Sequence, residues 1–112
     1  MSTFIYFISS DKMGNQDPAL GQVLMRNFFR KLIEDNSKPT HILFVESGVK
    51  LLLPDFEAHE ALKQLHEEGV KLLACKTCLD FYGIEHNITT GVVSDMPTII
   101  RVMHEADKVI SF

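Results

Sequence analysis

Two cysteines separated by two residues, Cys75 and Cys78, are the side chains of this sequence best suited by type and spacing to chemistry. The nucleophilic form of cysteine is the thiolate, so a reactive cysteine needs surroundings that lower its pKa. If a helix begins near Thr77, the free amides of its first turn direct partial positive charge at Cys75, and Lys76 adds a full charge nearby. Cys78 then lies about one helical turn away, within reach for a disulfide or a sulfur transfer. The pattern favours redox, sulfur or metal chemistry, with Cys75 and Cys78 as the catalytic pair.

Two other interpretations of the cysteines stay open. Free cysteine is among the most buried residue types, so both thiols could instead be small, inert members of the core. The second alternative is zinc, but a closed zinc site takes four ligands, and none of the five histidines pairs in spacing with the cysteines. We therefore expect no metal and no cofactor in a single chain. A zinc ion shared between two subunits would escape this objection.

The elements that must position the cysteines are visible as alternating apolar runs and amphipathic segments. Short, nearly continuous apolar runs are typical of strands buried on both faces, and they cover Phe4 to Ile8, Ile42 to Val45, Val70 to Ala74 and Val109 to Phe112, with a shorter one at Gly91 to Val93. One helix is predicted to open with Asp17 as its cap and Pro18 in its first turn, and its inner face carries Leu20, Val23, Leu24, Phe28 and Leu32. Two more helices are predicted, one from about Glu57 to Glu68 and one after Asp95. The alternation predicts an α/β fold with a mostly parallel sheet of about five strands and helices on both faces. The expected strand order is 2-1-3-4-5.

Length and composition limit the classes of function. At 112 residues and 46% hydrophobic content, the chain fits one domain covering residues 1–112. The net charge of -4 is small, with both signs interspersed, so nucleic acid is not an expected partner. We find no signal-peptide pattern and no apolar run long enough to span a bilayer, so we expect a cytoplasmic protein without a membrane partner.

In parallel α/β sheets, function collects beyond the carboxyl ends of the strands. Those ends include the loop around Asp11, the segment around Gly48 and the cysteine pair. Gly48 would let the backbone approach a ligand closely. The Asp11 loop lacks a phosphate-binding glycine pattern, so a polar connection is its favoured interpretation. The predicted ligand-binding residues of this rim are Asp11, Gly48, Lys76 and Thr77.

The run from Gly69 to Gly83, GVKLLACKTCLDFYG, resembles the DsrE/DsrF-like sulfur-relay family, and the likeness extends over nearly the whole chain. Within that family the chain is most similar to the C-terminal DsrE-like domain of the YedF proteins, which are associated with selenium metabolism. Three further segments support the resemblance: SSDKMG at 9–14, LGQVLM at 20–25 and SGVK at 47–50.

The resemblance implies a flavodoxin-like three-layer fold, assembly into dimers, trimers or hexamers, and a cysteine that carries sulfur as a persulfide. In sulfur-carrying members the active cysteine follows the third strand and precedes a glycine by eight positions. Cys75 and Gly83 keep that interval, so the carrier role passes to Cys75. The role of Cys78 as a resolving thiol is our own inference. YedF proteins usually carry an N-terminal TusA-like domain, so here we expect either a TusA-like or other persulfide-donor protein as partner, or a fragment of a longer chain.

The sequence thus favours a sulfur-relay protein that carries sulfane sulfur, or selenium, on a cysteine and acts as a sulfurtransferase or a plain carrier. One alternative is a non-enzymatic, oligomeric module of the same fold that binds a small ligand or zinc. Another is a scaffold with inert cysteines.

Overall fold

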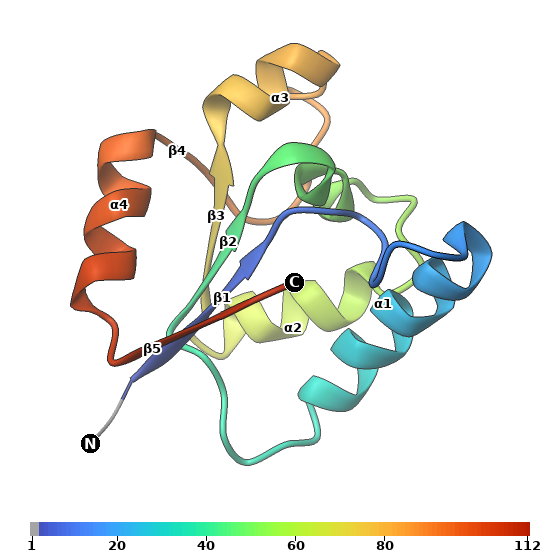
Figure 1. Ribbon diagram of the computed structural model, residues 1–112, viewed down its shortest axis with the longest axis horizontal. Helices are drawn as coiled ribbons and strands as arrows, with labels where there is room; N and C mark the ends of the chain where they lie inside the picture. The colour runs from blue at the N-terminus through green and yellow to red at the C-terminus, as the bar shows by residue number, and fades with distance from the viewer. Residues whose placement is uncertain (1–2) are drawn as a thin grey trace.

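The computed structural model describes residues 3–112 and consists of five strands that alternate with helices (Figure 1). In chain order the elements are β1 Phe4–Ile8, α1 Pro18–Leu32, β2 His41–Phe44, the 3-10 helix η1 Glu46–Leu52, α2 His59–Glu67, β3 Lys71–Cys75, α3 Lys76–Tyr82, β4 Val92–Ser94, α4 Met96–Glu105 and β5 Lys108–Ser111. Every predicted strand and helix is present, with ends that differ by one or two residues. No helix within residues 3–112 combines the length and the apolar character needed to cross a membrane.

All five strands are parallel, in the order β4-β3-β2-β1-β5, with helices on both faces of the sheet. This confirms the predicted α/β class. The predicted strand order 2-1-3-4-5 is wrong, because β1 lies between β2 and β5 rather than between β2 and β3. The first four strands step in one direction across the sheet, and α4 carries the chain back over the opposite face to β5. This follows from right-handed crossovers, in which reversing the direction of travel moves the connecting helix to the other face.

The sheet buries a different set of side chains on each face. On one face, Tyr6, Ile8, Ile42 and Phe44 belong to a core that also holds the buried sides of α1 and α2. On the other face, Ile5, Leu43, Val45, Cys75 and Ile99 form a smaller core, against which Val102, Met103 and Ala106 of α4 pack. Successive strand residues therefore alternate between two cores, as expected for a sheet covered on both sides.

The buried side of α1 differs from the prediction. Asp17 caps the helix as expected, accepting hydrogen bonds from the backbone N–H groups of Ala19 and Leu20. The buried residues are Gly21, Met25, Phe29 and Leu32, whereas Leu20, Val23 and Leu24 are exposed. A Cβ at position 21 would lie 2.8 Å from the carbonyl oxygen of Met13. Close packing at this glycine turns its side of the helix inward.

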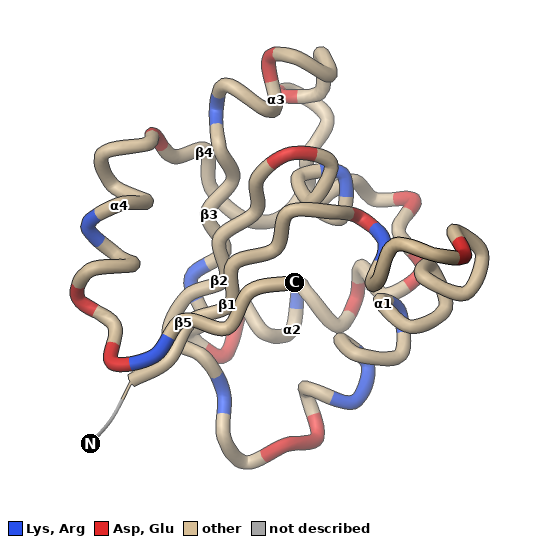
Figure 2. Tube along the Cα trace, viewed as in Figure 1, with Lys and Arg blue, Asp and Glu red and all other residues tan. Residues whose placement is uncertain are grey.

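The last strand also departs from the expectation of burial on both faces. β5 is an edge strand that pairs only with β1, and all four of its residues are exposed. Elsewhere Lys and Arg are interspersed with Asp and Glu around the molecule (Figure 2).

Candidate functional site

The two cysteines lie where β3 runs directly into α3, at the carboxyl edge of the sheet (Figure 1). Cys75 is the last residue of β3, stands beside Ser94 of β4, and immediately precedes the first residue of α3. Its side chain belongs to the core beneath α4, and the residue is only 3% exposed. Cys75 is thus a free thiol held by the sheet and almost entirely covered.

Cys78 lies one helical turn further along α3 and is only half-buried. Its side chain contacts both hydrophobic cores, one of which contains Cys75. The backbone N–H of Glu46, at the start of η1, donates a hydrogen bond to the Sγ of Cys78 over 3.1 Å. Glu46 adopts a left-handed backbone conformation with φ of 51°, which is uncommon outside glycine. The turn between β2 and η1 therefore directs a backbone donor at the sulfur.

The pKa of Cys78 is raised above its ordinary value. Partial burial is the largest cause, since it disfavours the thiolate, and the side chain of Cys75 raises the pKa further. The Glu46 amide acts in the opposite direction, because it stabilises negative charge on the sulfur. At rest Cys78 therefore keeps its proton at neutral pH, while a donor is already in place for the thiolate.

Lys76 and Thr77 are the first two residues of α3, and both are exposed. Lys76 is exposed, and its ammonium lies 3.0 Å from a carboxylate oxygen of Glu85 and 3.4 Å from Asp80. The hydrogen bond to Glu85, followed by that to Asp80, raises the pKa of Lys76. The charge of Lys76 is therefore paired with these two carboxylates rather than with a thiol. Thr77 is exposed at the start of α3.

Gly48 has a packing role that the sequence did not indicate. A Cβ at this position would lie 2.5 Å from the carbonyl oxygen of Ile8, so only glycine lets η1 pack against the end of β1. The contact is with backbone of the same chain, which accounts for the glycine without a ligand.

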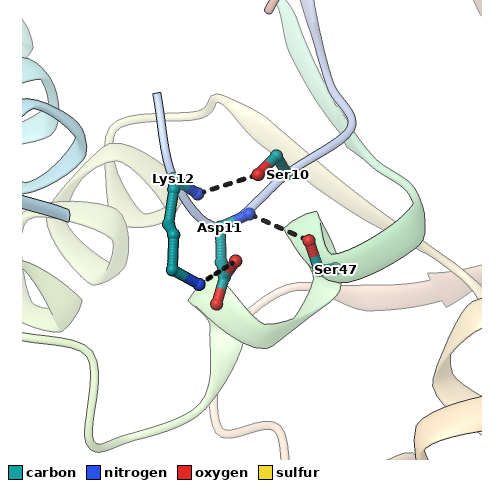
Figure 3. Close-up of polar contacts among 4 residues, drawn as sticks. All are labelled: Ser10, Asp11, Lys12 and Ser47. Atoms are coloured by element: carbon teal, nitrogen blue, oxygen red, sulfur yellow. Dashed lines mark hydrogen bonds and ion pairs between the residues drawn. The ribbon is translucent and has the colours of Figure 1, made fainter. Parts of the chain in front are cut away.

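The Asp11 loop packs beside η1, as Figure 3 shows. The backbone N–H of Asp11 donates to the Ser47 hydroxyl over 3.2 Å, and the Asp11 carboxylate pairs with Lys12 at 3.2 Å. Asp11 also lines a cleft of about 300 Å³ together with Lys50. The ammonium of Lys50 lies 4.3 Å from the ring centroid of Tyr82 in α3, so the cleft and the cysteine helix are connected through one side chain.

The structure therefore brings three of the predicted strand ends to one rim, with η1 between the Asp11 loop and α3. The Glu46 amide and the Lys50–Tyr82 contact were not predicted. A backbone donor leaves no residue-type signal, and a positive φ outside glycine cannot be seen in a sequence. Within residues 3–112, no cluster of three or more His, Cys, Asp or Glu side chains is arranged to hold a metal ion.

Comparison with known proteins gives a family and a fold. Residues 5–112 match the family described as DsrE/DsrF-like. Among solved structures, the chain is similar to the YchN protein from E. coli, with 21% identity and a TM-score of 0.74, and to MTH1491, a protein of unknown function from Methanobacterium thermoautotrophicum, with 22% identity and a TM-score of 0.70. Both alignments cover 100% of each chain. No curated protein matches.

Proposed function

The chain belongs to the DsrE/DsrF-like family, and on that premise we propose that it is a sulfur-relay protein that carries sulfane sulfur on the Cys75–Cys78 dithiol. One observation carries the proposal: two free thiols lie together at the end of β3, one of them half-buried with a backbone donor at its sulfur. A dithiol with one accessible sulfur, faced by a hydrogen-bond donor, is suited to reversible sulfur exchange.

The chemistry is thiol–persulfide exchange. A thiolate of the pair attacks the outer sulfur of a donor persulfide R–S–SH, the S–S bond of the donor breaks, and the donor leaves as R–S⁻. The chain then holds the sulfur as Cys–S–SH until an acceptor takes it. No external oxidant or reductant is consumed, because sulfane sulfur keeps its oxidation state throughout the transfer.

The finer assignments extend this proposal. The YedF-like segments support selenium as an alternative cargo, since the outer selenium of a donor R–S–SeH can pass to a thiolate by the same exchange, with R–S⁻ as the leaving group. A TusA-like or other persulfide-bearing protein in the cytoplasm is the proposed donor. The exposed apolar residues of β4 and α4, Val92, Val93, Met96 and Ile100, are compatible with a homo-oligomer.

The test is intact mass after incubation with a small persulfide and removal of the reagent. The wild-type chain should gain the mass of one sulfur atom, and a reductant should reverse the gain. The matched control is the double variant Cys75→Ser, Cys78→Ser, which should gain nothing. A wild-type chain that gains no sulfur while its thiols react with an alkylating reagent would show that the relay proposal is wrong.

A second candidate function is a small-ligand or zinc-binding module. The cleft of about 300 Å³ beside Asp11 and Lys50 is the observation that favours it. A zinc ion would have to be shared between copies, because residues 3–112 of one chain bring no group of three such ligands together. Metal analysis of the purified protein, combined with its mass in solution, tests this alternative directly.

A further inference from the structure

The two thiols differ sharply in access to a bulky donor. Cys75 is 3% exposed and lies in the core with Ile5, Leu43, Val45 and Ile99. Cys78 is half-buried at the surface of α3. A persulfide can reach the sulfur of Cys78 from solvent, whereas an approach to Cys75 requires the carboxyl edge of the sheet to open first.

The more accessible sulfur, that of Cys78, is also the one that a backbone N–H group faces. The Glu46 amide donates to Cys78, not to Cys75, over 3.1 Å. It is held there by the left-handed turn at Glu46 and by the packing of Gly48 against Ile8. A rigid donor of this kind stabilises negative charge on the sulfur that it faces, both during attack and when the sulfur later leaves.

From these two observations, and resting on the proposed sulfur-relay function, we propose that Cys78 accepts the incoming sulfur and that the buried Cys75 is the resolving thiol, with Glu46 as a positioning residue. This reverses the roles that the resemblance implies for the two cysteines. In the loading step, the Cys78 thiolate attacks the outer sulfur of R–S–SH, forming Cys78–S–SH and releasing R–S⁻.

The second step defines what Cys75 does. Its thiolate attacks the inner sulfur of Cys78–S–SH, so that the Cys75–Cys78 disulfide forms and hydrosulfide leaves. The sulfane sulfur is reduced to sulfide, and the two thiols supply its two electrons. Cys75 thus limits the lifetime of the persulfide when no acceptor is present, and burial protects Cys75 from loading itself.

The resting state fits this division of roles. The raised pKa of Cys78 keeps most of the thiol protonated at neutral pH, so loading should accelerate as the pH rises. Replacing Cys75 with alanine removes its hydrogen bond to Cys78, which is one of the causes of that shift. The pH profile of Cys78 should therefore move to lower pH in Cys75→Ala.

The experiment compares wild type, Cys75→Ser and Cys78→Ser, each incubated with a small persulfide, by intact mass, by peptide mapping of the loaded residue and by sulfide release. Cys75→Ser should load at a rate comparable to wild type, retain the sulfur for longer and release no sulfide. Cys78→Ser should load about tenfold more slowly or worse, because an opening free energy of about 1.4 kcal/mol alone gives that factor.

The opposite pattern, in which Cys78→Ser loads normally and Cys75→Ser does not, would overturn the inference and leave the relay function standing. A wild type that neither gains sulfur nor releases sulfide would instead overturn the relay function. Mapping of the wild type with limiting iodoacetamide does not depend on either variant folding. Cys78 should be labelled first, and prior labelling of Cys75 would refute the assignment.

Discussion

Replacing Gly48 with alanine tests whether close packing of η1 on β1 holds the candidate site together. The added Cβ would lie 2.5 Å from the carbonyl oxygen and 3.2 Å from the carbonyl carbon of Ile8, and both are backbone atoms that cannot rotate away. That same oxygen accepts a hydrogen bond from the N–H of Val45 over 2.9 Å. Relief of the clash must therefore move η1, which begins at Glu46, relative to the end of β1.

The magnitude follows from two opposing effects. Overpacking costs about 1–3 kcal/mol. The φ of Gly48 is not in the left-handed region, so alanine can adopt the native backbone conformation there. Because alanine also lowers the conformational entropy of the unfolded chain, it offsets the cost with a stabilisation of about 0.4–1 kcal/mol. The net expectation is a loss of about 1–2 kcal/mol, which should lower the urea midpoint by roughly 0.5–1 M.

The assay is urea unfolding followed by circular dichroism, combined with the alkylation rate of Cys78 in the folded protein. Gly48→Ala should change both, because the Glu46 amide moves with η1. The control is Gly69→Ala, whose Cβ meets nothing within 4 Å but whose φ is +103°, at the opposite edge of the sheet. It should lose stability through backbone strain and leave the Cys78 rate unchanged. A Gly48→Ala protein with wild-type stability and a wild-type alkylation rate would refute the reasoning.

Three further expectations follow from the same structure. Alkylation of Cys78 should accelerate through a pH midpoint above the ordinary thiol value of 9.0, and in Cys75→Ala this midpoint should fall. A peptide-resolved rate profile that shows no difference between wild type and Cys75→Ala would contradict the coupling. Leu79→Ala should cost about 2–5 kcal/mol in urea unfolding, because Leu79 is fully buried and anchors α3 to the core. The pKa of Asp95 is lowered mainly by its hydrogen bonds from Thr98, so its capping contribution is complete above the ordinary value of 3.8 and is lost as the pH falls through the lower folded value. The difference in Tm between wild type and Asp95→Ala should accordingly be present at pH 7 and shrink below about pH 4, and a difference that is constant with pH would show that the carboxylate charge is not involved.

Local patterns predicted the elements of this fold well, because capping and periodicity are local properties. Asp17 caps α1 as expected, Asp95 caps the helix predicted to follow it, and Gly83 ends α3 in a left-handed conformation. On α1, Leu32 and Phe28 face the core as predicted, but Leu20, Val23 and Leu24 do not, for a physical reason. Two apolar stripes run side by side along this helix, and the deciding residue is Gly21, which contributes nothing to hydrophobic periodicity but packs against Met13.

The strand order and the details of the site depend on long-range contacts and could not be predicted in this way. The position of β5 beside β1 is set by the face that α4 covers, which no short segment encodes. At the site, the sequence identified the cysteines and the three strand ends that meet there. It could not indicate that Cys75 is almost fully covered whereas Cys78 is only half-buried, because that difference depends on the tertiary packing around the end of β3.

The pairing of the last strand with the first has a consequence for local opening. β5 buries little, but it is held at both ends: the Asp107 carboxylate accepts from the Thr3 backbone over 2.7 Å, and the Phe112 ring packs against Tyr6 and Phe28. These contacts bridge more than 80 residues of sequence, so the entropy cost of closing them is high until the intervening chain has folded. We expect amide hydrogens of β5 to exchange through detachment of this strand alone, while those of β2 and β3 exchange only in global unfolding. β2 and β1 lie between β3 and β5, so detachment of β5 leaves the strand that carries Cys75 in place.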